Sequence, residues 1–126
     1  MSLLGSQADA LDWKVQTVAG QKVVAHGYCT VINLSSCTEG PLPTIDIKKQ
    51  PIGGTLEFGN TSDIVRFIRK GEKRVSAGRC TGMKDHCVTI LYTPRSDFHG
   101  PDEITYTVRH PNQSEDWNDT VAIDVR

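Results

Sequence analysis

The chain has 126 residues, which suits one domain with its own hydrophobic core and is too short for two ordinary domains. Its 37% hydrophobic and 23% charged residues are typical of a folded protein, and a formal net charge of -1 gives no electrostatic reason to expect nucleic acid or anionic lipid as a partner. No apolar run approaches the roughly 18 residues of a membrane span, and no segment has the pattern of a signal peptide.

Most of the chain shows the period-two alternation of apolar and polar residues that is typical of β-strands. No window carries the i, i+3, i+4, i+7 stripe of an amphipathic helix, and clusters of Gly, Pro and Asn separate the alternating segments. In chain order, the predicted strands are 13–18, 22–29, 44–48, 55–58, 64–68, 87–92, 103–108 and 120–125. Seven to eight short strands with frequent turns predict an all-β sandwich.

The C-terminal strands also show which side should face the core. In segments 103–108 and 120–125 every second residue is apolar and the residues between are mostly polar, as in antiparallel sheets with one buried face. The expected core residues there are Val88, Ile90, Tyr92, Ile104, Tyr106, Val108, Val121, Ile123 and Val125.

Four cysteines, Cys29, Cys37, Cys80 and Cys87, bear on the cellular compartment. Their spacings, C-x7-C and C-x6-C, match neither the C-x2-C pair of a zinc site nor that of a thioredoxin-type redox motif. We therefore expect two disulfides, which form in an oxidising compartment. This predicts an exported protein, either periplasmic or extracellular.

Residues 50–126 resemble a known family. The stretches "QPIGGTLEF", "VTILYTPRSDFHGPDEITYTV" and "DTVAIDV" are similar to the Ig-like and cadherin-like domains of bacterial exported proteins, whose pattern includes Y-x-P-x-x-x-F-x-G-x-D-x-[FI]-x-Y-x-V. The residues on that pattern are Tyr92, Pro94, Phe98, Gly100, Asp102, Ile104, Tyr106 and Val108.

The resemblance implies an all-β, Ig-like Greek-key β-sandwich of seven to eight antiparallel strands. It implies a non-catalytic structural or adhesive module of a bacterial periplasmic or cell-surface protein, although such modules serve many functions. We expect residues 11–126 to form this single domain. Residues 1–10, which begin with Met1-Ser2-Leu3, are expected to be a vector-derived or flexible N-terminal segment.

A structural corner is predicted within the stretch 92–110. It comprises Tyr92, Pro94, Phe98, Gly100, Asp102 and Tyr106. We expect Asp102 to accept a hydrogen bond from a turn N–H, and the Tyr106 hydroxyl to bond back to the backbone near the preceding turn. Gly100 should supply a backbone conformation that other residues reach only with strain, and Phe98 should close the end of the core. This interpretation accounts for the spacing of Asp97, His99 and Asp102 without catalysis.

A Greek-key sandwich favours one pairing of the cysteines. Cys29 ends one predicted strand and Cys87 begins an antiparallel neighbour, so nested bridges Cys29–Cys87 and Cys37–Cys80 are expected. The chain-entropy estimate gives about 4 kcal/mol for such long loops, against about 2.5 kcal/mol for short ones. The local pairing, Cys29–Cys37 and Cys80–Cys87, stays open.

The sequence carries no recognisable catalytic set and predicts neither an enzyme nor a bound cofactor. Its histidines, His26, His86, His99 and His110, are scattered, and there is no G-x-S-x-G, P-loop or G-x-G-x-x-G motif. A second acidic cluster, Glu115, Asp116 and Asp119, matches neither an EF-hand nor a cadherin linker, so no metal site is predicted.

Two ligand hypotheses remain alternatives to a purely structural role. The first is a carbohydrate-binding or calcium-dependent ligand-binding module, for which the aromatic candidates are Trp13, Tyr28 and Trp117. The second is an anion contact in segment 67–79, formed by Arg69, Lys70, Lys73, Arg74 and Arg79. That segment is otherwise a solvated hairpin whose charges discourage edge pairing. The expected partner is a protein or a cell-surface polysaccharide, and the sequence does not indicate an oligomeric state.

Each asparagine begins an N-x-S/T triplet, at Asn33, Asn60, Asn112 and Asn118. In a eukaryotic secreted protein these triplets would be glycan acceptors. Because Asn, Ser and Thr all favour turns and the resemblance is bacterial, we interpret the triplets as turn chemistry.

Overall fold

The computed structural model describes residues 10–70, 73–111 and 113–126, and gives the backbone alone for residues 10, 11, 69 and 70. Its strands are β1 (Ala10–Thr17), β2 (Val23–Cys29), β3 (Ile32–Asn33), β4 (Thr38–Glu39), β5 (Thr44–Lys49), β6 (Gly54–Ile64), β7 (Phe67–Lys70), β8 (Lys73–Ser76), β9 (Lys84–Pro94), β10 (Gly100–Arg109) and β11 (Trp117–Val125). A 3-10 turn, η2 (Gly78–Cys80), precedes β9. The described residues contain no α-helix, which confirms the predicted β-rich fold. Among them there is therefore no helix long and apolar enough to cross a membrane.

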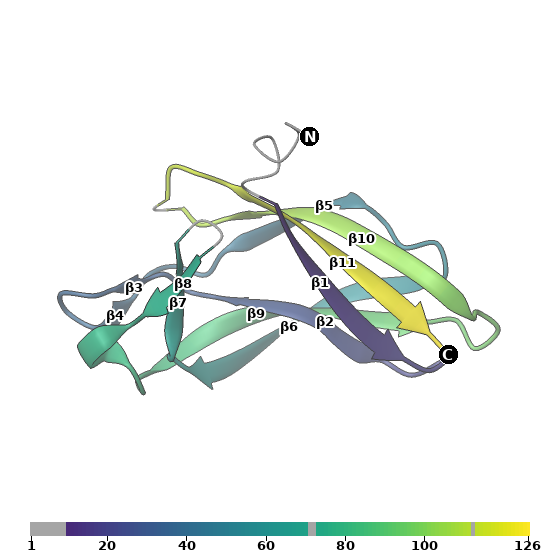
Figure 1. The fold of residues 1–126 in the computed structure, drawn as a ribbon, viewed down its shortest axis with the longest axis horizontal. Helices are drawn as coiled ribbons and strands as arrows, with labels where there is room; N and C mark the ends of the chain where they lie inside the picture. The colour runs from purple at the N-terminus through teal and green to yellow at the C-terminus, as the bar shows by residue number, and fades with distance from the viewer. Residues whose placement is uncertain (1–9, 71–72, 112) are drawn as a thin grey trace.

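Two sheets form the body of the molecule. One has the strand order β1-β11-β10-β5 and the other the order β2-β9-β6. Both run along the long axis, while the short pairs β3–β4 and β7–β8 gather at one end (Figure 1). The strands of the two larger sheets match the number predicted, and the short pairs are additional.

The core lies between the two larger sheets. Its buried members are Ala25, Tyr28, Ile90, Tyr92, Ile104, Tyr106, Val108, Val121, Ile123 and Val125. The alternation in β10 and β11 therefore predicted their buried faces correctly. The prediction for Val88 was wrong, because Val88 is only half-buried. Along β9 the buried face changes: Asp85 and Cys87 are buried on one face, and Ile90 and Tyr92 on the other. Val88 lies where this change occurs.

The N-terminal strand departs from the expected antiparallel arrangement. β1 pairs in parallel with β11, with Trp13 beside Val121 (Figure 1). After β1 the chain crosses to the other sheet and does not turn back in a hairpin. β1 therefore pairs with the edge of the C-terminal strand, β11. Backbone bonds between Ala19 and Arg126 (2.8 Å) and between Arg126 and Thr17 (2.9 Å) fix this end. Of the predicted N-terminal segment 1–10, only Ala10 lies within the described residues, and it begins β1.

The predicted strand 64–68 is interrupted at Val65. The Val65 amide donates to the Met83 carbonyl (2.8 Å), and the Val65 carbonyl accepts from Gly82 (2.7 Å), so the chain leaves β6 there before β7 begins. Val65 is buried in a second, smaller apolar cluster with Ile32, Ala77 and Cys80. A burial site away from the main core thus overrides the local strand pattern.

Candidate functional site

A cavity of about 550 Å³ opens at the end of the molecule where the short strand pairs lie. Its wall comes from β1, β2 and the following segment into β3, the end of β6, the β7–β8 hairpin, the start of β9 and the start of β11. This volume falls within the range of small-molecule sites, which are concave and largely apolar with a few polar groups. The cavity is therefore the first candidate for a binding site.

Aromatic side chains from separate strands form much of the wall. Trp13, Tyr28 and Trp117, the three aromatic candidates from the sequence, all line the cavity, and Phe67 joins them with 62% of its surface exposed. The Trp13 ring stacks on His26 with the centroids 4.1 Å apart. Such flat faces favour ligands that offer an apolar or planar surface.

Polar groups complete the cavity. The Arg74 guanidinium lies 5.3 Å from the centre of the Trp13 ring, within cation–π range. Asp63 lies 3.5 Å from Arg66 and accepts a hydrogen bond from the Ile64 amide at 2.7 Å. Within the described residues, the buried Nε1 of Trp13 has no hydrogen-bond partner.

A buried hydroxyl network supports the cavity from the core side. The Tyr28 hydroxyl donates to Asp119 at 2.5 Å and lies 2.6 Å from the Tyr106 hydroxyl. Burial, the neighbouring Tyr106 and the bond to Asp119 raise the pKa of Tyr28, which keeps its hydroxyl neutral and donating. Asp119 thus serves the core, whereas Asp116 is exposed and pairs with Arg109 at 3.0 Å. The acidic cluster of the sequence therefore does not act as one cation site.

The predicted corner lies at the opposite end of the molecule. Asp102 accepts hydrogen bonds from the amides of Ile52, Gly53 and Glu103 at 2.9 Å and from the Tyr92 hydroxyl at 2.6 Å. Burial disfavours ionisation of Asp102, but these bonds outweigh it and lower its pKa. The corner hydroxyl therefore comes from Tyr92 rather than Tyr106, because Tyr106 points across the core to Tyr28.

The remaining corner residues agree with a structural role. Gly100 has a φ of 120°, and Pro94 is fully buried. A Cβ at Gly53 would lie 2.4 Å from the Phe98 ring, so Phe98 packs directly on the turn before β6. Asp97 is exposed beside Arg95, and His99 is exposed as well. Sequence proximity of Asp97, His99 and Asp102 does not create a shared site.

The basic segment forms the β7–β8 hairpin, as one of the two interpretations predicted. The side chains of Arg69 and Lys70 lie outside the described residues. Lys73 and Arg79 are exposed, and Arg74 alone of the described basic residues predicted there lines the cavity. The structure does not gather Lys73, Arg74 and Arg79 into one pocket.

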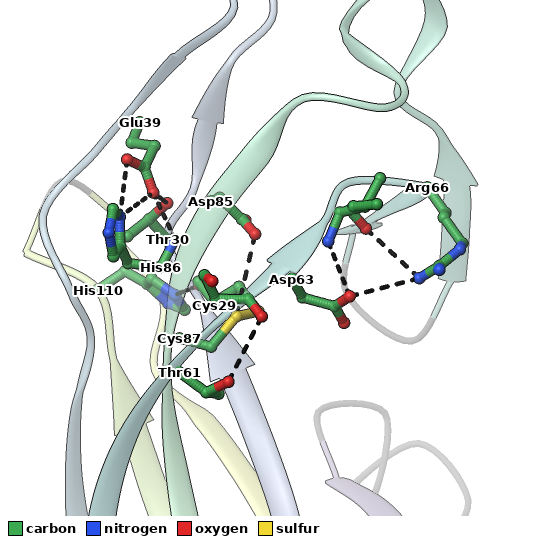
Figure 2. Close-up of a disulfide and its surroundings, with 12 residues drawn as sticks. Cys29, Thr30, Glu39, Thr61, Asp63, Arg66, Asp85, His86, Cys87 and His110 are labelled. Atoms are coloured by element: carbon green, nitrogen blue, oxygen red, sulfur yellow. Dashed lines mark hydrogen bonds and ion pairs between the residues drawn. A yellow bond between two sulfur atoms is a disulfide. The ribbon is translucent and has the colours of Figure 1, made fainter.

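Both disulfides follow the nested pairing. Cys29–Cys87 joins directly opposite residues of β2 and β9, and Cys37–Cys80 joins the turn between β3 and β4 to η2. Figure 2 shows the first bridge with its surroundings, including Asp85 beside it. Cys29 is half-buried in the cavity wall, whereas Cys87 is only 2% exposed.

One buried acidic side chain lies beside the Cys29–Cys87 bridge. Asp85 is 4% exposed, and its Oδ1 lies 3.9 Å from the Cys87 sulfur (Figure 2). Burial raises the pKa of Asp85 to about 6, helped by the charges of Glu39 and Asp63 and opposed by His86. His86 itself is exposed and holds Glu39 through its ring and its amide. Sequence reasoning missed Asp85, because only the strand pairing reveals its burial.

The four histidines occupy separate places. His26 stacks on Trp13, His86 pairs with Glu39, His99 is exposed, and His110 lies 3.1 Å from the Cys29 carbonyl. No Ser–His–Asp arrangement joins them within the described residues.

The asparagine triplets divide between a turn and strands. Asn33 accepts hydrogen bonds from the amides of two following serines, as the turn interpretation predicted. That interpretation is wrong for Asn60 and Asn118, which lie within β6 and β11. Asn112 lies outside the described residues.

Fold and site together define a disulfide-bonded, nearly all-β protein with an aromatic cavity at one end. No protein-family model matches the chain, and no curated protein matches it. Similar solved structures include the solution structure of amebosin, with 12% identity, a TM-score of 0.42 and coverage of 93% of this chain and 96% of that chain.

Two further solved structures are similar. A family 123 glycoside hydrolase from Clostridium perfringens has 5% identity and a TM-score of 0.42, over 91% of this chain and 23% of that chain. The cysteine protease inhibitor EhICP2 from Entamoeba histolytica has 14% identity and a TM-score of 0.31, over 93% of this chain and 94% of that chain. At these levels the similarity assigns neither a family nor a function.

Proposed function

We propose that the protein is a non-catalytic, Ig-like Greek-key module of a bacterial periplasmic or cell-surface protein, with an adhesive role based on saccharide binding in the aromatic cavity. The bacterial Ig-like pattern of residues 92–108 and the two sheets around one core support the fold assignment. The two disulfides are consistent with an exported protein.

One observation carries the binding assignment: Trp13, Tyr28 and Trp117, which lie far apart in the sequence, line a single cavity. A sugar ring has an apolar C–H face that stacks on aromatic rings, and hydroxyl groups that bond to planar carboxylates and guanidiniums. Asp63 and Arg66 provide such groups in the cavity wall. An aromatic wall with a few polar groups matches this ligand class.

The charged pair Asp63 and Arg66 supports a binding role. Asp63 is engaged by Arg66 and by the Ile64 amide. Binding without catalysis needs only fixed complementary groups, which these contacts provide.

Glycan-array screening followed by calorimetry tests the proposal. We expect binding to oligosaccharides of bacterial surface polysaccharides, and a loss of affinity of at least tenfold in Trp13→Ala and Trp117→Ala, since each removes part of the aromatic wall. Phe58→Ala is the matched control, because Phe58 is 51% exposed and lies outside the cavity wall. Absence of saccharide binding, or tryptophan variants that bind like the wild type, would contradict the proposal.

A further inference from the structure

The two disulfides differ in what surrounds their sulfur atoms. Asp85 Oδ1 lies 3.9 Å from the Cys87 sulfur, and Asp85 is almost completely buried. The Cys80 sulfur instead lies 3.5 Å from the Leu34 carbonyl, in the apolar cluster with Ile32 and Val65. Among the described residues, a carboxylate therefore contacts the first bridge and none contacts the second.

Asp85 has no evident structural reason to be buried as an acid. Within the described part of the chain, no Lys or Arg lies within ion-pair distance of it. Burying a carboxylate without a cation is unfavourable, so such a residue is a candidate for proton transfer. Its partner in that role would be the Cys87 sulfur, which lies 3.9 Å from Asp85 Oδ1 and becomes a thiolate when the bridge opens.

The bridge is also asymmetric in access. Cys29 is half-buried and belongs to the cavity wall, whereas Cys87 is 2% exposed. An incoming thiolate would therefore attack the Cys29 sulfur, and Cys87 would be the leaving sulfur. The buried acid lies beside the sulfur that would leave.

From this geometry we propose that Cys29–Cys87 is a thiol–disulfide exchange site for a small dithiol, with Asp85 as the proton donor to Cys87. The exchange does not require a bound saccharide, although Cys29 and Asp85 line the same cavity. In the forward step a thiolate of the dithiol bonds to the Cys29 sulfur, and the Cys29–Cys87 bond breaks. Its electron pair goes to the Cys87 sulfur, which takes the proton of the Asp85 carboxyl group.

The second thiol of the dithiol completes the exchange. After losing its proton to solvent, it attacks the dithiol sulfur bound to Cys29, and Cys29 leaves as a thiolate that solvent protonates. The protein disulfide has then gained two electrons, and the dithiol has become a cyclic disulfide. In the reverse direction the Asp85 carboxylate would take the proton from the Cys87 thiol.

The charges that face Asp85 suit this role. The charges of Glu39 in β4 and Asp63 in β6 favour its protonated form, whereas His86 in β9 opposes it. With a pKa of about 6, Asp85 is divided between acid and carboxylate near neutral pH. It can therefore both donate and accept a proton.

Timed reduction of the folded protein with dithiothreitol, followed by alkylation and peptide mass spectrometry, tests the proposal at both bridges. Rates are divided by the dithiothreitol thiolate concentration at each pH from 5 to 8. For Cys29–Cys87 we expect the normalised rate to rise as the pH falls through about 6, and to drop at least tenfold at pH 5.5 in Asp85→Asn. Cys37–Cys80 should respond to neither change.

Asp63→Asn provides a second test that leaves Asp85 intact. This change removes the negative charge of Asp63, which lies opposite Asp85 and raises its pKa. The pH at which the normalised rate rises should therefore be lower than in the wild type. A normalised rate without pH dependence in the wild type, an unchanged rate in Asp85→Asn, or an unmoved inflection in Asp63→Asn would overturn the proposal.

Discussion

Two buried aspartates, at opposite ends of the molecule, have similar exposure and opposite pKa shifts. Asp102 is 6% exposed and Asp85 is 4% exposed. Burial disfavours ionisation of both, but four donors surround Asp102 and lower its pKa, whereas burial and neighbouring negative charges raise that of Asp85. Burial alone therefore does not set the direction of the pKa shift, and the hydrogen-bond donors and charges around the carboxyl group decide it.

The two ends also differ in what stabilises them. The corner end depends on the Asp102 hydrogen bonds and on Phe98 packed against Gly53. The cavity end has short strand pairs and a small apolar cluster, and both disulfides lie in or near it. This contrast leads to four predictions, which follow in order of decreasing effect.

Removing the Cys37–Cys80 bridge should have the largest effect. The bridge spans 43 residues, so the double change Cys37→Ala, Cys80→Ala should cost about 4 kcal/mol of unfolding free energy in urea titrations. Hydrogen exchange should show protection lost first in β3, β4, β7 and β8, with β10 and β11 retained. Equal loss of protection at both ends would contradict the division of the molecule into two differently stabilised regions.

Removing the carboxylate of the corner should come next. Asp102→Ala leaves the amides of Ile52, Gly53 and Glu103 and the Tyr92 hydroxyl without their acceptor, so we expect a loss of about 3 kcal/mol in urea unfolding. Asp97→Ala is the control, because Asp97 is exposed and should change the unfolding free energy by less than about 0.5 kcal/mol. Equal effects from the two variants would show that the Asp102 bonds do not hold the corner.

The pH dependence of stability should have opposite signs at the two aspartates. The pKa of Asp85 is higher in the folded than in the unfolded state. The contribution of Asp85 to the unfolding free energy is therefore present at pH values below its unfolded-state pKa and is lost as the pH rises through about 6. The unfolding free energy of Asp85→Asn relative to the wild type should therefore improve by about 1–3 kcal/mol from pH 4 to pH 8.

Asp102→Asn serves as the opposite case. The pKa of Asp102 is lower in the folded than in the unfolded state. The contribution of Asp102 to the unfolding free energy is therefore present at pH values above its unfolded-state pKa and is lost as the pH falls through its folded-state pKa. This variant should lose stability relative to the wild type as the pH rises from 2 to 5. Parallel pH curves for the two amide variants in urea titrations would contradict the contrast.

The smallest effect should come from the hairpin contact at the cavity. Arg74→Gln removes the cation from the Trp13 ring and should lower the unfolding free energy by about 0.5 kcal/mol. Tryptophan fluorescence should report the change, since Trp13 and Trp117 both line the cavity. Arg79→Gln, at an exposed residue of η2, is the control, and an equal change in its fluorescence would argue against the contact.

Local sequence patterns were sufficient for much of the fold. Strict alternation placed Ile104, Tyr106, Val121 and Ile123 on buried faces, because side chains of a strand point alternately to its two sides. The number of cysteines and their strand positions favoured the nested disulfides that the structure contains. The Gly100 conformation and the role of Asp102 as a turn acceptor also follow from residues close in the chain.

Only the tertiary structure decided what depends on distant strands. The parallel pairing of β1 with β11, the meeting of Trp13, Tyr28 and Trp117 at one cavity, and the choice of Tyr92 over Tyr106 at the corner all require knowing which strands lie together. Asp85 belongs to the same class, since its burial and its neighbours Glu39 and Asp63 come from other strands. A periodic pattern reports the direction of a side chain along its own strand, but its partners are set by pairing across long sequence separations.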